Sequence, residues 1–131
     1  MNEGEVYFAL TGDYDFDPAV ITERLGIEPS RVKRKADPRP KTTSWVLSSG
    51  KVVDDVVDVY AMSSELVSRL APRTQQIKQL MTDLNLSAVL EVVLRITMDE
   101  TKSTPAIGFE AETIRFLSSV SAFIDVDTYR K

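Results

Sequence analysis

The stretch from Ser87 to Met98 constrains the fold more than any other, because its apolar residues recur at every second position. One side of the alternation consists of Leu90, Val92, Leu94, Ile96 and Met98, and the other consists of Val89, Glu91, Val93, Arg95 and Thr97. A period of two is typical of a β-strand with one buried face. The stretch therefore predicts a long strand.

Other segments predict a mixture of strands and helices. Alternation or β-branched composition predicts strands at residues 5–12, 44–50, 106–109 and 122–129. Apolar residues at helical spacing predict helices at residues 18–26, 63–84 and 111–119. Asp17 before Pro18 is a favourable helix start, Ser63 or Ser64 a second one, and Gly26 a stop. Residues 51–60 mix valines with aspartates and are assigned an irregular lead-in.

The predicted order of elements is β-α-β-α-β-β-α-β. A chain of 131 residues fits one domain, residues 1–131. The simplest packing is an α+β two-layer sandwich, in which helices cover one face of a mainly antiparallel sheet. Both ends repeat a strand, an acidic loop, a short helix and a strand, which suggests a pseudo-repeat of β-α-β halves.

Composition disfavours several classes of function. The chain has no cysteine and no histidine, which excludes thiolate metal sites, cysteine nucleophiles and histidine-based triads. No phosphate-binding glycine loop is present, so we expect no enzyme and no cofactor. The net charge of −4 makes nucleic acid an unfavourable partner. No apolar run is long enough to span a membrane and no signal peptide is evident, so the expected location is the cytoplasm.

The segment 31–41 concentrates positive charge on an otherwise acidic chain. It contains six basic residues and one acid, Asp37, and two prolines that exclude a helix. As a binding site for phosphate, carboxylate or an acidic protein surface it would use Arg31, Lys33, Arg34, Lys35, Arg39 and Lys41. The alternative is a solvated loop whose charges pair with the acidic body.

Trp45, the only tryptophan, follows this basic loop. It is a candidate binding residue, because an exposed indole can stack on a ligand or contact a cation. The strand period instead favours a core position, where the ring would contribute volume. Both readings stay open at this point.

Acidic residues at alternate positions are the remaining chemical signal. Asp13, Asp15 and Asp17 match only the start of a calcium loop, and Asp17 is already explained as a helix cap. Asp125 and Asp127 share one face of the last predicted strand, most simply the solvent face. Sequence proximity alone does not place carboxylates across a cleft, so no catalytic or metal-binding residue is assigned.

Several motifs together resemble one bacterial family, the domain of unknown function number 4279. They are Tyr7–Gly12, Phe16–Pro18, Leu25–Pro29, Arg34–Lys35, Ser44–Trp45, Pro105–Ile107 and Glu112–Leu117. The similarity extends over nearly the whole chain. It implies a small bacterial cytoplasmic domain and supplies no active site.

Charge separation, the missing catalytic residue types and this resemblance lead to three functional hypotheses. The first is a non-catalytic protein-binding module, with an immunity or antitoxin-like inhibitor as its sharpest form. The second is a module that binds a phosphate-bearing or anionic metabolite through residues 31–41. The third is a structural or regulatory dimer formed through an exposed sheet edge.

Overall fold

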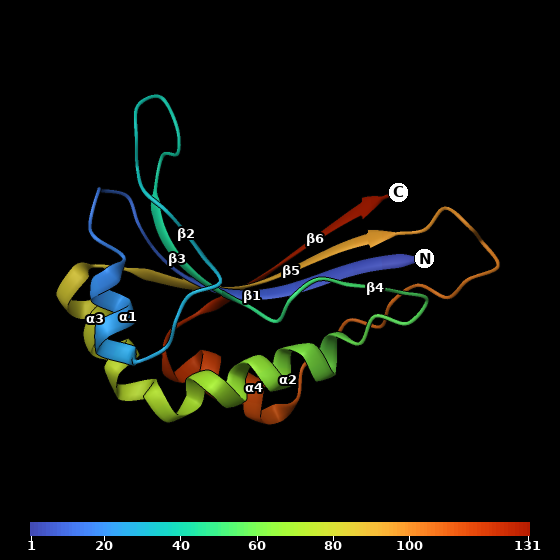
Figure 1. Cartoon of the computed structure of the whole chain (residues 1–131). Helices are drawn as coiled ribbons and strands as arrows, with labels where there is room; N and C mark the ends of the chain where they lie inside the picture. The colour runs from blue at the N-terminus through green and yellow to red at the C-terminus, as the bar shows by residue number, and fades with distance from the viewer.

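The computed structural model describes all residues 1–131, which form one six-stranded sheet and a layer of helices (Figure 1). The strands run in the order β2-β3-β1-β5-β6, and β4 also pairs with β1. Their bounds are β1 Asn2–Gly12, β2 Arg31–Lys33, β3 Thr43–Ser48, β4 Val52–Asp54, β5 Ser87–Ile96 and β6 Phe123–Arg130. The expected α+β class with a mainly antiparallel sheet is confirmed, and one pair of strands makes the sheet mixed.

The long strand β1 organises the sheet. It runs antiparallel to β3, β4 and β5, and β2 adds antiparallel to β3. The sole parallel pair is β5 with β6. A parallel pair needs a crossover connection, and α4 (Ala111–Ser119) provides it.

The helices cover a single face of the sheet, as expected from the sequence (Figure 1). They are α1 (Ala19–Leu25), α2 (Val59–Leu70), α3 (Thr74–Leu84) and α4, and the 3-10 turn η1 (Ala71–Arg73) joins α2 to α3. The break at η1 contains Pro72, which restarts the helix because proline fits a first helical turn. We call the opposite, helix-free side of the sheet the bare face.

The hydrophobic core lies between the sheet and the helices. Its sheet side comes from alternate residues of β1, β3 and β5: Val6, Phe8, Leu10, Trp45, Leu47, Leu90, Val92 and Leu94. Its helix side includes Ile21, Leu66, Leu70, Ile77, Leu80 and Phe116. Each core strand thus directs one side of its alternation toward the helices, as the sequence predicted, although residues of the other side such as Ala9 and Val46 are buried as well.

Short-range signals set most helix ends. Gly26 adopts a left-handed conformation with φ of 68°, and Asn85 ends α3 in the same way with φ of 52°. Asp17 accepts a hydrogen bond from the Ala19 amide at 3.0 Å. The expected start at Ser63 or Ser64 is wrong, because Asp58 caps α2 by accepting the Ala61 amide at 3.0 Å. Ser63 lies buried inside α2 and donates its hydroxyl to the Val59 carbonyl.

The predicted order needs further corrections. Residues 106–109 form no strand; instead Gly108 packs against Tyr60 so closely that a Cβ there would overlap the ring. Two short strands, β2 and β4, form where a loop and an irregular segment were expected. The pseudo-repeat is not confirmed, since β1 and β3 are antiparallel neighbours whereas β5 and β6 are parallel.

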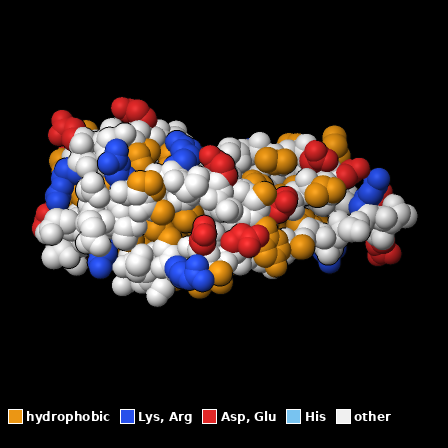
Figure 2. All heavy atoms as spheres, turned by 90° about the horizontal axis from the view of Figure 1, so that it is seen from below, with side chains coloured by type: hydrophobic (Ala, Val, Ile, Leu, Met, Phe, Trp, Pro, Cys, Tyr) orange, Lys and Arg blue, Asp and Glu red, His pale blue; other side chains and the backbone are white.

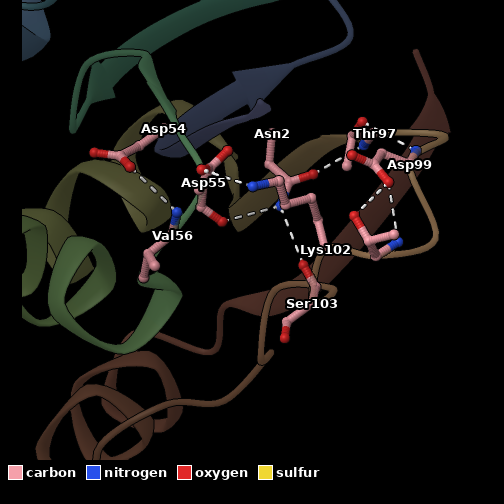
Figure 3. Close-up of polar contacts among 9 residues, drawn as sticks. Asn2, Asp54, Asp55, Val56, Thr97, Asp99, Lys102 and Ser103 are labelled. Carbon is pink, nitrogen blue, oxygen red and sulfur yellow. Dashed lines mark hydrogen bonds and ion pairs between the residues drawn. The ribbon is translucent and has the colours of Figure 1, made fainter.

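The side chain of Asn2 forms hydrogen bonds that link β1 to two loops distant from it in the sequence (Figure 3). Its side chain is 1% exposed, and its amide oxygen accepts the Thr97 amide at 2.8 Å. Its amide nitrogen donates to the carbonyls of Asp55 and Ser103 at 3.4 and 3.5 Å. Lys102 pairs with Asp55 across the same loops at 3.5 Å. Both connections at this end of the sheet are therefore held to β1.

The outer surface of the helix layer mixes apolar and charged groups. Figure 2 shows hydrophobic side chains gathered along the middle of this side, with acidic and basic groups between them. Tyr60 and Ile114 are among the exposed apolar residues. No helix in the structure combines the length and apolar character needed to cross a membrane.

Candidate functional site on the bare face of the sheet

Polar and charged side chains from five neighbouring strands lie together on the bare face. They come from the other half of each strand alternation, so they project away from the helices. From β2 to β6 these residues are Arg31 and Lys33, Ser44 and Ser48, Glu5 and Tyr7, Glu91 and Arg95, and Asp125 and Asp127. Small and aliphatic residues between them complete the surface: Ala9, Val46, Val89 and Val93.

Glu91, Asp125 and Asp127 form what we call the carboxylate cluster. Asp125 lies directly opposite Glu91 in the parallel pair, and Asp127 follows on the same face. One carboxylate oxygen of each residue lies within 4.8 Å of the others. Glu91 is 7% exposed, whereas Asp125 faces solvent. These are the side chains of the chain whose type and spacing fit a metal ion.

The environment of Glu91 disfavours its charged form. Burial is the largest cause and the two aspartates add to it, so the pKa of Glu91 rises to about 8. Tyr7 is its direct neighbour on β1. Burial, and then the nearby charge of Glu91, raise the pKa of Tyr7 above its ordinary value. The two groups are therefore kept neutral by the same patch of the sheet.

A second buried carboxylate, Glu5, has the opposite environment. Arg31 donates from Nη1 to Glu5 Oε2 at 2.8 Å, and Ser48 donates its hydroxyl to the same oxygen at 2.6 Å. Burial raises the pKa of Glu5, but these hydrogen bonds outweigh it and leave the pKa below its ordinary value. The Arg31 guanidinium also lies 4.9 Å from the centre of the Tyr7 ring. Arg31 is thus fixed in place by a carboxylate and an aromatic ring.

A hollow of about 310 Å³ lies beside Arg31 on the bare face. Its floor consists of Ala9, Val46 and Val89, and Tyr7, Arg31, Lys33, Thr42 and Ser44 are among the surrounding residues. Lys33 is exposed and forms no ion pair, so its charge is available at the rim. The hollow therefore has a cationic edge, while the carboxylate cluster lies farther across the sheet.

The structure divides the basic segment 31–41 into two parts. Arg31 and Lys33 belong to β2 and face the hollow. Arg34 pairs with Asp15 at 3.0 Å, and Lys35 donates to the Asp13 carbonyl at 2.9 Å. The rest forms an exposed loop that stands clear of the sheet on the side away from the helices (Figure 1).

The other two predicted basic residues, Arg39 and Lys41, lie on this exposed loop. Neither forms an ion pair, and neither lines the hollow. The six basic residues therefore do not converge on one site.

Trp45 requires a correction as a binding residue. Its side chain is fully buried, and its indole N–H donates to the Thr22 hydroxyl at 3.1 Å. A ring enclosed between the sheet and α1 has no surface on which a ligand can stack. Trp45 is a core residue because β3 directs it to the helix side, together with Leu47.

Sequence reasoning missed Glu5, Tyr7 and Glu91. The signal that could have revealed them is the presence of polar residues in the otherwise apolar strands β1 and β5, at the positions opposite to those that enter the core. Asp125 and Asp127 were recognised as sharing a face, but their neighbour was unknown. Nothing in the sequence stated that β6 would lie parallel to β5 and bring them to Glu91.

Fold and site together define a class: a single α+β domain with an open mixed sheet, helices on one face and a polar bare face. The chain belongs to the family described as Domain of unknown function (DUF4279), whose sequence profile matches residues 2–131. The expected family membership is thereby confirmed. Comparison with curated proteins and with solved structures found no match.

Proposed function

We propose that this chain is a non-catalytic protein-binding module of the bacterial cytoplasm and that β6 is its docking strand. The observation that carries the proposal is the exposure of this strand. It is the last strand of the sheet, so its outer backbone edge is unpaired. An unpaired edge offers a row of N–H and C=O groups to an added strand.

The side chains of β6 favour contact with another protein. Phe123 and Tyr129 are 58% and 48% exposed on the bare face. Ile124 and Val126, which point to the helix side, are still 39% and 36% exposed. A long edge strand with apolar residues on both faces is the type that proteins usually protect.

Charge indicates the chemistry of the partner. Asp125 and Asp127 place negative charge on the same face as the docking edge. A second copy of this chain would bring two more aspartates to that face, and like charges opposite one another destabilise a strand pair. We therefore assign the edge to an extended segment of a different protein that carries lysine or arginine at alternate positions. An immunity or antitoxin-like inhibitor, which blocks a basic surface of its target, is the sharpest form of this proposal.

A designed peptide of alternating valine and lysine tests the docking strand directly. We expect its addition to shift the backbone amide resonances of β5 and β6, in a saturable manner, in an NMR titration. The same peptide with glutamate in place of lysine is expected to bind at least about tenfold more weakly, because charge pairing across strands reverses sign.

Two variants of similar chemistry locate the contact. Ile124→Lys lies on the docking strand, and Ile114→Lys is its matched control, since Ile114 is 52% exposed on α4. We expect only Ile124→Lys to abolish the shifts. Shifts that persist in Ile124→Lys, or a wild-type protein that does not respond to the lysine peptide, would contradict the proposal. Affinity purification from the native host with the same two variants would then identify the partner.

A second candidate function follows from the hollow beside β2, which would bind a phosphate-bearing or anionic metabolite. The specific observation is that Lys33, which forms no ion pair, lies at a cavity of about 310 Å³ beside Arg31, whose charge is already paired with Glu5 at 2.8 Å. Arg34 and Lys35 already contact Asp15 and the Asp13 carbonyl. We assign this candidate to the hollow beside β2, because Lys33 lines a cavity there whereas Arg39 and Lys41 do not line it.

Thermal denaturation in the presence of pyrophosphate separates these two locations. A ligand that binds only the folded state raises its melting temperature, so we expect an increase of several degrees for the wild type. Lys33→Glu should abolish the increase, whereas Lys41→Glu and the Arg34→Ala/Arg39→Ala pair should retain it. Loss of the increase in the Arg34/Arg39 pair would place the ligand on the loop. No increase in the wild type would remove this candidate.

A further inference from the structure

We propose that the carboxylate cluster of Glu91, Asp125 and Asp127 is a binding site for a divalent metal ion. The three residues come from adjacent parallel strands, β5 and β6, so the backbone fixes their spacing. Their nearest carboxylate oxygens all lie within 4.8 Å of one another. A position central to three such oxygens lies at most about 2.8 Å from each, so small side-chain rotations bring all three within the about 2.0–2.6 Å at which such ions bind oxygen.

The burial of Glu91 is a separate observation that points to a ligand. Its side chain is 7% exposed, and no amide, hydroxyl, lysine or arginine of the chain donates to its carboxylate. A buried carboxyl group in a protein normally has a hydrogen-bond donor, a cation or a metal ion as its partner. Glu5, the comparable acid on the neighbouring strand, follows the rule through Arg31 and Ser48. Glu91 has only the two aspartates in front of it.

The arginines of the bare face do not compensate the charge of the cluster. Arg31 is already held by Glu5 at 2.8 Å and by the ring of Tyr7, which lies between Arg31 and the cluster. Arg95, on the same face of β5, is directed to Glu3 and to the Tyr129 ring. No basic group of the chain therefore compensates the charge of the two aspartates, or that of Glu91 when a metal ion displaces its proton.

The ligand set indicates the kind of metal ion. Three carboxylates and no imidazole or thiolate favour hard cations such as Mg²⁺, Mn²⁺ or Ca²⁺. Asp125 is exposed, so the outer side of the site is open to water molecules that would complete the coordination. Since the site is partly open, an affinity like that of weak calcium modules is expected, with a dissociation constant on the order of 10⁻⁴ to 10⁻³ M.

Paramagnetic Mn²⁺ is the most direct probe, because it broadens the NMR signals of nearby nuclei. We expect saturable broadening of amides around positions 91, 125 and 127 in the intact chain at millimolar Mn²⁺ or less. Mg²⁺ added in excess should reverse it. Asp127→Asn and Glu91→Gln should each weaken binding at least about tenfold, since each removes one carboxylate ligand of three.

The control variant is Glu65→Gln, an exposed acid on α2 outside the cluster. It should bind Mn²⁺ as the wild type does, and circular dichroism should show all variants folded. Broadening that is spread over acidic surface residues, or that is equal in the wild type and both cluster variants, would overturn the proposal. So would wild-type protein without broadening, which would mean that the cluster holds a proton only.

The metal site and the docking strand are tested independently. Binding of Mn²⁺ is read in the absence of any peptide, and peptide binding is read in the presence of a chelator. If one of these two experiments gives a negative result, the other proposal is unaffected. A metal ion bound to the cluster would, however, weaken the attraction of Asp125 and Asp127 for a basic partner.

Discussion

Replacing Glu91 with glutamine is expected to stabilise the metal-free protein at alkaline pH and to leave its stability near pH 5 almost unchanged. Glutamine keeps the shape of the side chain, remains neutral and can donate a hydrogen bond to Asp125 or Asp127. The expected gain in the free energy of unfolding at pH 9 is about 1–3 kcal/mol, allowing for screening on the open side of the cluster.

The direction follows from proton linkage. The pKa of Glu91 rises from an ordinary 4.5 to about 8 in the folded chain. Between these values the folded protein holds a proton that the unfolded chain has released, so stability falls as pH rises through this window. The groups facing Glu91 are Tyr7 from β1 and the two aspartates from β6, with Arg31 beyond Tyr7. The shifted pKa of Glu91 is the source of this slope, so replacing Glu91 removes most of it.

Urea denaturation at pH 5, 7 and 9 in buffer with a chelator measures this effect. The wild type should lose stability across the series relative to Glu91→Gln, and Glu65→Gln should follow the wild type. The prediction fails if the difference in unfolding free energy between the wild type and Glu91→Gln is the same at all three pH values. That result would mean that the folded protein does not raise the pKa of Glu91.

Replacing Trp45 with alanine is expected to cost about 3–5 kcal/mol of folding free energy. The side chain is fully buried between the sheet and α1, and its loss leaves a large cavity. The hydroxyl of Thr22 also loses the indole donor, which now lies 3.1 Å away. A binding tryptophan on the surface would cost far less.

Circular dichroism must follow this unfolding, because the variant lacks the only tryptophan. Val32→Ala is the matched control: Val32 lies opposite Trp45 in β2 and is 49% exposed, so its truncation should cost less than about 1 kcal/mol. Iodide should quench the wild-type tryptophan fluorescence only weakly. Strong quenching, together with a small loss of unfolding free energy in Trp45→Ala, would show that Trp45 is exposed at the surface.

Local sequence determined the longer elements of this protein, although not the short strands β2 and β4. The period of two in residues 87–98 specified β5, since a strand with one buried side needs an apolar residue at every second position. Gly26 and Asn85 specified helix ends, because each adopts a left-handed conformation that most residues avoid. Even the burial of Trp45 follows from the alternation in its strand. These features depend on neighbours along the chain, and a sequence contains that information directly.

Tertiary structure alone decided the candidate site. Asp125 and Asp127 were visible as a pair on one face, but Glu91 became their neighbour only because β6 lies parallel to β5. Similarly, Arg31 forms an ion pair with Glu5, apart from the other basic residues of segment 31–41, because β2 pairs with β3. Strand order and direction depend on how the whole core closes, so contacts across the sheet cannot be deduced from local periods. The sequence by itself determined what each strand buries, and the packing of the sheet determined which charges meet on the other side.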